Sequence, residues 1–349
     1  MRLSLRRFQS LFDLEPAAFE GLLRHADAIR RGEVVPDLRG RVAALLFFDP
    51  SLRTRVSLES ALARFGGSAS TLHPGRDSWV LESETGAVMD GDAQEHVREL
   101  APVLSRMCHV IGIRRAERIG GGQASGEAVV EDAFFETFAE HAQVPVINME
   151  SNRWHPLQGL ADAATIRQLL PDPRGKRFVL TWSWHPRALP VATPHSQLVA
   201  AASLGMEVTL LRPEGYDLVP EVVAAARERA EAAGGSLSVT SEREASFDGA
   251  HVVCAKSWGA LRPLGGSVSR VGHAHGPESG LRRTWIVDRE AMARTADAWF
   301  LHCLPVRRNV VVTDDVLDGP RSAVVAQAEN RLWTAAALLD ALLGADAVG

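Results

Sequence analysis

The chain has 349 residues, of which 46% are hydrophobic and 23% charged, which excludes a disordered or fibrous protein and predicts roughly two domains. Its 38 basic and 43 acidic residues give a formal charge of -5, so the chain as a whole does not attract nucleic acid or an anionic membrane. We therefore expect neither as a partner, and any anionic ligand must be held by local groups.

The first half of the chain predicts alternating strands and helices. VAALLFF at residues 42–48 is continuously apolar and predicts a strand, and a helical pattern follows at 54–65, ended by Gly66 and Gly67. The next expected elements are a strand at 68–72, a helix at 94–107, a strand at 109–113, a helix at 131–141 and a strand at 144–147. This order indicates a mostly parallel sheet.

The alternation begins again after a helix at 156–169. Strands are expected at 177–182, 207–211, 237–239, 251–254 and 298–301, and helices at 194–203, 219–233 and 328–343. We predict an α/β protein with two doubly wound parallel-sheet domains, residues 1–150 and 151–327, and a C-terminal helix in 328–349 that packs back on the first domain. Residues 265–280, rich in Gly, Ser and His, predict a surface loop.

The three cysteines, Cys108, Cys254 and Cys303, are too few and too scattered for a disulfide framework or a zinc cluster. The N-terminal residues lack the apolar core of a signal peptide, and no apolar run reaches the ~20 residues of a membrane span. We expect a cytoplasmic protein.

Polar residues gather after the predicted strands, where open α/β sheets bind their ligands. In FFDPSLRTRVS, residues 47–57, Ser51, Arg53 and Thr54 lie at the start of a helix, whose N–H groups attract an anion such as phosphate. The alternative is a helix that Ser51 merely caps, with solvated arginines. Arg114 ends the next strand and, taken alone, is more typical of a surface cation.

The segment INMESNRWHPLQ, residues 147–158, places Glu150, His155 and Gln158 around the start of a helix. A histidine at a helix N-terminus tends to stay neutral and can donate to a carbonyl oxygen that becomes negative. A capping or core histidine is the alternative.

Three segments of the second half also follow predicted strands: TWSWHP carries His185, CAKSWGA carries Lys256, and LHCLPVRRN carries Cys303. AENR, residues 328–331, adds Arg331 at the start of the last helix. Lys256 can pair with a substrate carboxylate or simply be exposed. Cys303 lacks a recognisable base partner, so we expect a buried structural cysteine rather than a nucleophile. Because the sequence has no GxGxxG, P-loop or metal-ligand spacing, we expect no nucleotide cofactor and no metal.

Three motifs together, SLRTR at 51–55, HPLQ at 155–158 and HCLP at 302–305, resemble the aspartate/ornithine carbamoyltransferase family over essentially the whole chain. WVLESETGAVMDGD at 79–92, INME, TWSWHP, AKSWGA and AENR are similar to its N-acylornithine branch. The resemblance implies carbamoyl transfer from carbamoyl phosphate to the δ-amine of N-acetyl- or N-succinylornithine in arginine biosynthesis. It also implies a homotrimer, a knotted loop in the second domain, no covalent intermediate and no cofactor.

The resemblance also implies where the donor binds. The implied phosphate ligands are Ser51, the Leu52 backbone, Arg53, Thr54 and Arg114, with Trp79 reaching the site of a neighbouring subunit. The carbamoyl oxygen would meet Thr54, Arg114 and His155, with Arg331 close by. The carbamoyl amide would meet Gln158 and the backbone near Cys303 and Leu304.

The acceptor would bind Glu150, His185 and Lys256, with Arg307 available for an extra carboxylate. Acetylornithine enzymes carry a glutamate and a lysine where this chain has Gln94 and Val311. Because Gln94 removes a repulsive charge, we favour a succinyl cap slightly. An acetyl cap, another acceptor such as ornithine, and a non-catalytic relative that binds an anion remain as alternatives.

Overall fold

The computed structural model describes residues 2–116, 130–261 and 280–344. The chain divides into two compact units. Unit 1 contains residues up to Ala116, Glu131–Leu160 and the chain from Arg331 onward, and Ala161–Asn330 form the body of unit 2. Within these described ranges, no helix has the length and apolar character needed to cross a membrane.

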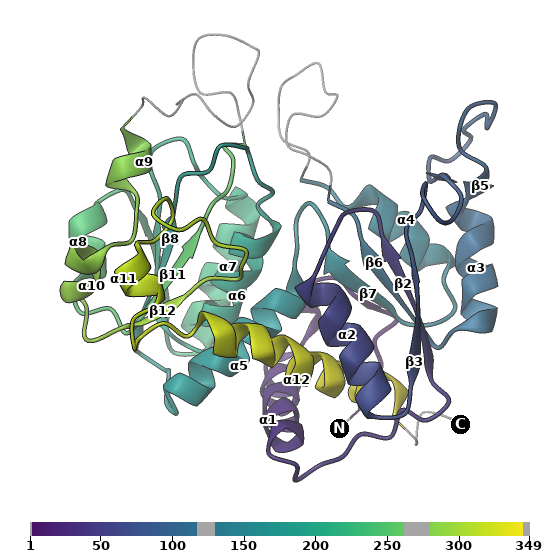
Figure 1. Cartoon of the computed structure of the whole chain (residues 1–349), viewed down its shortest axis with the longest axis horizontal. Helices are drawn as coiled ribbons and strands as arrows, with labels where there is room; N and C mark the ends of the chain where they lie inside the picture. Colours follow the sequence, from purple (N-terminus) through teal and green to yellow (C-terminus); the bar gives the residue numbers. More distant parts are fainter. Residues whose placement is uncertain (1, 117–129, 262–279, 345–349) are drawn as a thin grey trace. The chain divides into compact units, whose positions relative to one another are not determined.

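Unit 1 is built on a five-stranded parallel sheet (Figure 1). Its strands, in spatial order, are β1 (Arg7–Phe8), β7 (Val146–Glu150), β6 (Val110–Arg114), β2 (Val42–Phe47) and β3 (Ser68–Leu72). Its helices are η1 (Leu11–Asp13), α1 (Pro16–Arg30), α2 (Arg53–Arg64), α3 (Val97–Met107) and α4 (Ala133–His141). Two short strands, β4 (Leu81–Glu82) and β5 (Glu95–His96), pair apart from the main sheet.

One face of this sheet forms a buried apolar core with two helices. Ala44 and Leu46 of β2 lie on the same face, because side chains alternate along a strand, and Ile111 and Ile113 of β6 continue it. The helices add residues at three- and four-residue spacings, which is the helical period. These are Val97, Ala101 and Leu104 of α3, and Phe134, Phe135 and Phe138 of α4.

Unit 2 contains a second five-stranded parallel sheet (Figure 1). Its strands, in spatial order, are β10 (Ser236–Thr240), β9 (Glu207–Leu211), β8 (Arg177–Trp182), β11 (Val252–Lys256) and β12 (Trp299–Leu301). Its helices are α6 (Ala192–Ser203), α7 (Pro220–Ala232), α8 (Arg243–Phe247), α9 (Leu281–Thr284), α10 (Arg289–Ala293) and α11 (Asp314–Leu317). The unit boundaries fall inside α5 (Pro156–Leu169) and α12 (Val324–Leu343).

Each sheet has a point where the chain reverses the direction in which it adds strands. In unit 1 this point lies between β2 and β6, and in unit 2 between β8 and β11. Loops that leave such neighbouring strands at their carboxyl ends separate and open a crevice, which is where doubly wound sheets bind ligands. The strand order of each unit thereby marks one edge of its sheet as the place to look for a ligand site.

The predicted α/β fold with two parallel sheets is confirmed. Helix α3 begins at Val97 rather than near residue 94, because the preceding residues form β5 and His96 caps the helix by accepting from the Arg98 N–H. Helix α12 begins four residues before the expected start. The expected boundaries were residues 150 and 328, whereas the compact units change at Leu160 and Arg331. The expected surface loop falls, apart from Gly280, outside the described residues.

The last part of α12 belongs to unit 1, where it contacts the N-terminal region. His25 of α1 lies 2.7 Å from the carboxylate of Asp340, and the Leu3 N–H donates to the Ala341 carbonyl oxygen at 2.9 Å. The guanidinium of Arg64 lies over the ring of Trp333. The C-terminal helix therefore forms part of the packing of unit 1.

Two glycines provide a matched test of the packing in unit 2. Gly205 and Gly175 both have a left-handed backbone, with φ of 68° and 66°. A Cβ at Gly205 would lie 2.4 Å from the Ala233 carbonyl oxygen, whereas no described atom lies within 4 Å of a Cβ at Gly175. We expect Gly175→Ala to lower the free energy of unfolding by about 1–2 kcal/mol and Gly205→Ala by about 2–4 kcal/mol. Equal losses in urea denaturation would contradict this packing.

Candidate active site

The segment after β2 forms an uncapped helix start in unit 1. Leu52 occupies the N-cap position of α2, and no side chain there accepts a hydrogen bond from the first turn. The alternative in which Ser51 merely caps the helix is therefore wrong. The N–H groups of the first turn, with the side chains of Ser51 and Arg53 beside them, form a local positive end that suits an anion.

A buried arginine connects three of the predicted residues. Arg331, only 3% exposed, donates to Thr54 Oγ1 at 2.8 Å and to Gln158 Oε1 at 2.6 Å. Its guanidinium also lies 3.4 Å from His155 Nε2. The structure thus brings together the motifs SLRTR, HPLQ and AENR in one cluster. Its hydrogen bonds to Thr54 and Gln158 go to neutral oxygens.

The ends of β6 and β7 add an ion pair to this cluster. Arg114 pairs with Glu150, and Glu150 Oε2 lies 3.6 Å from His155 Nε2. The loops are tied together, since the Ala116 N–H donates to Asp49 Oδ2 at 2.9 Å and the Arg115 N–H donates to the Glu150 carbonyl at 2.9 Å. The interpretation of Arg114 as a solitary surface cation is wrong, and His155 is buried beside two charged groups.

Trp79 and Gln94 lie together on a separate, exposed part of unit 1. Strands β4 and β5 pair in parallel, and the Gln94 N–H donates to the Val80 carbonyl oxygen at 3.0 Å. Trp79 is 59% exposed, and Val88 and Met89 on the same segment are also exposed. The structure does not bring Trp79 and Gln94 into the buried cluster around Arg331.

In unit 2, the loops after β8 and β11 are joined by hydrogen bonds. Ser183 Oγ lies 3.0 Å from Ser257 Oγ, and the indole N–H of Trp182 donates to the Trp258 carbonyl oxygen at 2.9 Å. These loops carry His185 and Lys256, both partly exposed. The switch point of the second sheet therefore holds these two residues on a rigid support of buried tryptophans.

The HCLP turn follows β12, next to β11 in the same sheet. His302 Nδ1 accepts the Leu304 N–H at 2.9 Å, so a neutral imidazole carries its proton on Nε2. Leu304 has a φ of 55°, a left-handed conformation that is uncommon for a leucine and often marks a functional turn. Cys303 is only partly buried, so the expectation of a buried cysteine was wrong there, and Cys254 is the buried one.

Two residues that support the HCLP turn were not foreseen from the sequence. Gln327 accepts the His302 N–H at 2.9 Å and donates to Asp162 Oδ1 at 2.5 Å, and both side chains are buried. A carboxylate on an otherwise apolar face of the helix GLADAAT was the available signal, because buried charges require partners. Arg307, beyond the turn, is exposed, whereas Arg308 pairs with Asp314 and Asp318.

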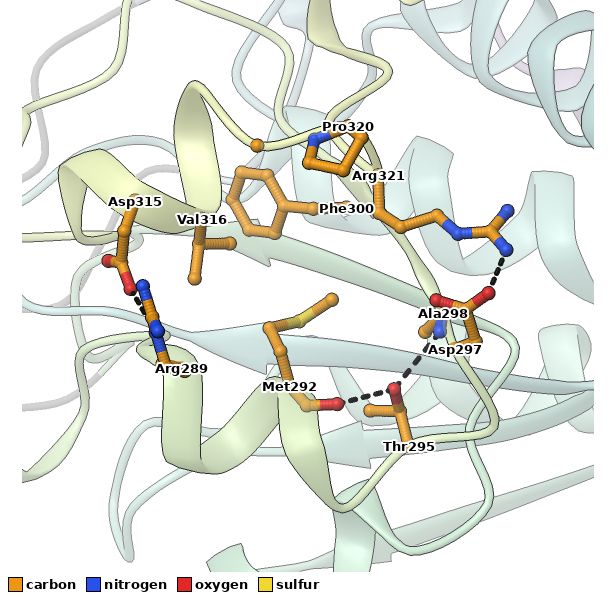
Figure 2. A pocket seen from close by; sticks show the side chains of 11 residues that line it. Arg289, Met292, Thr295, Asp297, Ala298, Phe300, Asp315, Val316, Pro320 and Arg321 are labelled. Atoms are coloured by element: carbon orange, nitrogen blue, oxygen red, sulfur yellow. Dashed lines mark hydrogen bonds and ion pairs between the residues drawn. The ribbon is translucent and has the colours of Figure 1, made fainter.

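Unit 2 also has a pocket of about 220 Å³ away from these loops (Figure 2). Phe300 and Val316 line it, and Arg321 pairs with Asp297 at one end while Arg289 pairs with Asp315 at the other. Because each of these arginines already faces a carboxylate, the pocket offers no strong anion site. Among the described residues, no group of three or more His, Cys, Asp or Glu side chains is arranged to hold a metal ion.

Comparison with known protein families shows to which of them the chain is related. Residues 6–168 match the carbamoyl-phosphate-binding domain of aspartate/ornithine carbamoyltransferases, and residues 191–342 match their aspartate/ornithine-binding domain. The chain belongs to the aspartate/ornithine carbamoyltransferase family. The resemblance inferred from the three motifs is confirmed.

Individual relatives support the N-acylornithine branch. The chain is 40% identical to an N-acetylornithine carbamoyltransferase of Xanthomonas campestris pv. campestris, covering 98% of this chain and 99% of that protein. It is 35% identical to an N-succinylornithine carbamoyltransferase of Bacteroides fragilis, with 96% of each covered. One similar crystal structure is of an N-acetyl-L-ornithine transcarbamylase with a glutamate replaced by alanine, complexed with carbamyl phosphate and N-succinyl-L-norvaline. It has a TM-score of 0.87 and 40% identity over 97% of this chain and 100% of that chain.

The Arg331 cluster yields a direct prediction. Lysine keeps the charge but cannot reach Thr54 and Gln158 with a planar fork, so Arg331→Lys loses at least one charge-assisted hydrogen bond. At about 1.5–3 kcal/mol for each such bond, kcat/KM of carbamoyl transfer should fall about a hundredfold. Arg24→Lys, in an exposed pair with Glu20, is the control and should change kcat/KM by less than about twofold. Steady-state kinetics in which the two variants behave alike would contradict the role of this cluster.

Proposed function

We propose that this carbamoyltransferase moves the carbamoyl group of carbamoyl phosphate to the δ-amine of an N-acyl-L-ornithine. The products are N-acyl-L-citrulline and phosphate. This reaction is a step of arginine biosynthesis. The observation that supports this most strongly is the buried cationic cluster of Arg331, Thr54, Gln158 and His155 beside the uncapped start of α2. A phosphate and a carbonyl oxygen are the two groups that such donors suit.

In this proposal the phosphate binds the first turn of α2 and two arginines. Ser51, the Leu52 N–H, Arg53 and Thr54 contact it from one side and Arg114 from another. A guanidinium has five donors, so Arg114 can keep Glu150 and still bind phosphate. Trp79, exposed on its segment, reaches the site of a neighbouring subunit in a homotrimer.

Catalysis then rests on alignment and charge stabilisation. As the δ-amine attacks the carbamoyl carbon, the carbonyl oxygen becomes negative and meets Thr54, Arg114, His155 and Arg331. The tetrahedral intermediate loses phosphate as its carbon–oxygen bond breaks, and the departing phosphate takes the proton that the attacking nitrogen releases. Because the amine attacks the carbamoyl carbon directly, no covalent enzyme intermediate forms. Holding both substrates in this geometry can supply roughly 7–11 kcal/mol. Gln158 and the backbone at Cys303 and Leu304 hold the carbamoyl amide.

The acceptor binds Glu150, His185 and Lys256. We propose that N-succinylornithine is preferred, because Gln94 carries no negative charge and the exposed Arg307 can pair with a second carboxylate. Val311 is buried and uncharged, so it contributes no charge next to the acyl cap. N-Acetylornithine is the second candidate, because the acetylornithine relative is more similar, at 40% identity against 35%.

Since none of the three cysteines forms a disulfide, we place the reaction in the reducing cytoplasm.

A competition assay tests the proposed function. The enzyme receives carbamoyl phosphate with equal concentrations of N-acetylornithine and N-succinylornithine, and the products are identified by mass. We expect N-acylcitrulline, with the succinyl product in excess. Absence of both products would contradict the N-acylornithine assignment, and excess acetylcitrulline would contradict the preferred cap.

Gln94 is expected to influence the choice of cap. Gln94→Glu introduces a negative charge that repels the succinyl carboxylate, so the ratio of kcat/KM for the succinyl and acetyl acceptors should fall about tenfold or more toward acetyl. Gln143→Glu makes the same change at another exposed glutamine and should leave the ratio unchanged. A ratio that moves equally in both variants, or in neither, would show that Gln94 does not contact the cap.

A further inference from the structure

The loop Ser151–Trp154 joins two residues of the proposed site. Glu150 ends β7 and His155 precedes α5, and their side chains lie 3.6 Å apart. The conformation of four intervening residues therefore sets how the carboxylate and the imidazole face each other. Any group that fixes this loop also fixes that pair.

Asp132 is the side chain that holds the loop from outside. It occupies the N-cap position of α4, where an aspartate ordinarily accepts from the first turn of its own helix, yet it makes no such hydrogen bond. Its carboxylate instead accepts the Ser151 hydroxyl at 2.7 Å and the Arg153 N–H at 3.1 Å. The side chain is only 6% exposed, so these contacts replace the water that a carboxylate would otherwise bind.

Polar groups in and next to the loop form hydrogen bonds with one another around the Ser151 hydroxyl. Ser151 Oγ accepts from Asn148 Nδ2 at 2.8 Å and from the Trp154 N–H at 3.2 Å, while it donates to Asp132. Trp154 packs edge-on against Phe12 with ring centroids 5.7 Å apart. Burial raises the pKa of Asp132, and the hydrogen bonds from Ser151 and Arg153 oppose that effect by favouring the ionised carboxylate.

We propose that Asp132 is a positioning residue. By fixing the loop between Glu150 and His155, it holds their side chains in the orientation that carbamoyl transfer requires. This inference rests on the proposed function for its catalytic consequence. None of the contacts described above joins Asp132 to Arg331 or to the start of α2. It therefore acts on the His155 imidazole and the Glu150 carboxylate through the loop. Its loss should therefore affect the chemical step more than the binding of the phosphate donor.

The test compares Asp132→Ala and Asp132→Asn with a control on the same helix. Glu136→Gln is the control. The Gln9 side-chain amide donates to Glu136 at 3.2 Å and to Asp132 at 3.4 Å, but Glu136 has no contact with the loop among those given for the described residues. Two quantities are measured: hydrogen exchange of the backbone amides in Ser151–His155, and kcat and KM for carbamoyl phosphate. Asparagine keeps one acceptor oxygen, so Asp132→Asn should show a smaller effect than alanine and remains informative if the alanine variant fails to fold.

We expect faster exchange in this segment for both Asp132 variants, and a fall in kcat of about tenfold or more for alanine, because sub-ångström misplacement of a catalytic group is costly. KM for carbamoyl phosphate should stay within about threefold, and Glu136→Gln should resemble the wild type. Unchanged exchange, unchanged kcat in a variant with faster exchange, or a loss confined to donor KM would each overturn the proposal. If the wild type makes no N-acylcitrulline, the proposed function fails, and the exchange comparison still decides whether Asp132 fixes the loop.

Discussion

The arrangement of unit 1 depends on one buried cation. Arg331 comes from the last helix, yet the residue is only 3% exposed and its guanidinium hydrogen-bonds side chains of α2 and α5. Burying a guanidinium is costly unless its donors and its charge are satisfied. Thr54 and Gln158 satisfy donors with neutral oxygens, and the nearby start of α2 adds further positive potential. An incoming phosphate and a developing oxyanion would be stabilised by this positive charge, so we propose that the C-terminal helix contributes to the chemistry as well as to the folding of unit 1.

Most of the fold could be predicted because its strands are continuously apolar and its helices follow the helical period. Residues 177–182 and 207–211 were expected as strands and form β8 and β9. The errors came from interactions outside the local pattern. Residues 95–96 pair with β4 rather than starting a helix, and α12 gains a turn at Val324, where Gln327 bonds Asp162 far away in the sequence. Helix α1 was not foreseen at all.

The sequence predicted the motif residues of the site better than it predicted the residues that hold them in place. His155 stands out because polar groups follow an apolar strand, and Arg331 because it belongs to a recognisable motif, AENR; the structure brings the two together. Asp162 and Asp132 lie outside the motifs, and their hydrogen-bond partners, Gln327 and Ser151, are 165 and 19 residues away in the sequence. Trp79 and Gln94 differ from these residues, because they lie on an exposed segment outside the buried cluster around Arg331.

The most direct measurement of this account is a crystal structure of the protein with bound carbamoyl phosphate. The account predicts the phosphate at the N–H groups of the first turn of α2, beside Arg53, with the carbonyl oxygen within hydrogen-bond distance of Thr54, His155 or Arg331. A donor bound elsewhere, with Arg331 contacting only protein groups, would contradict it.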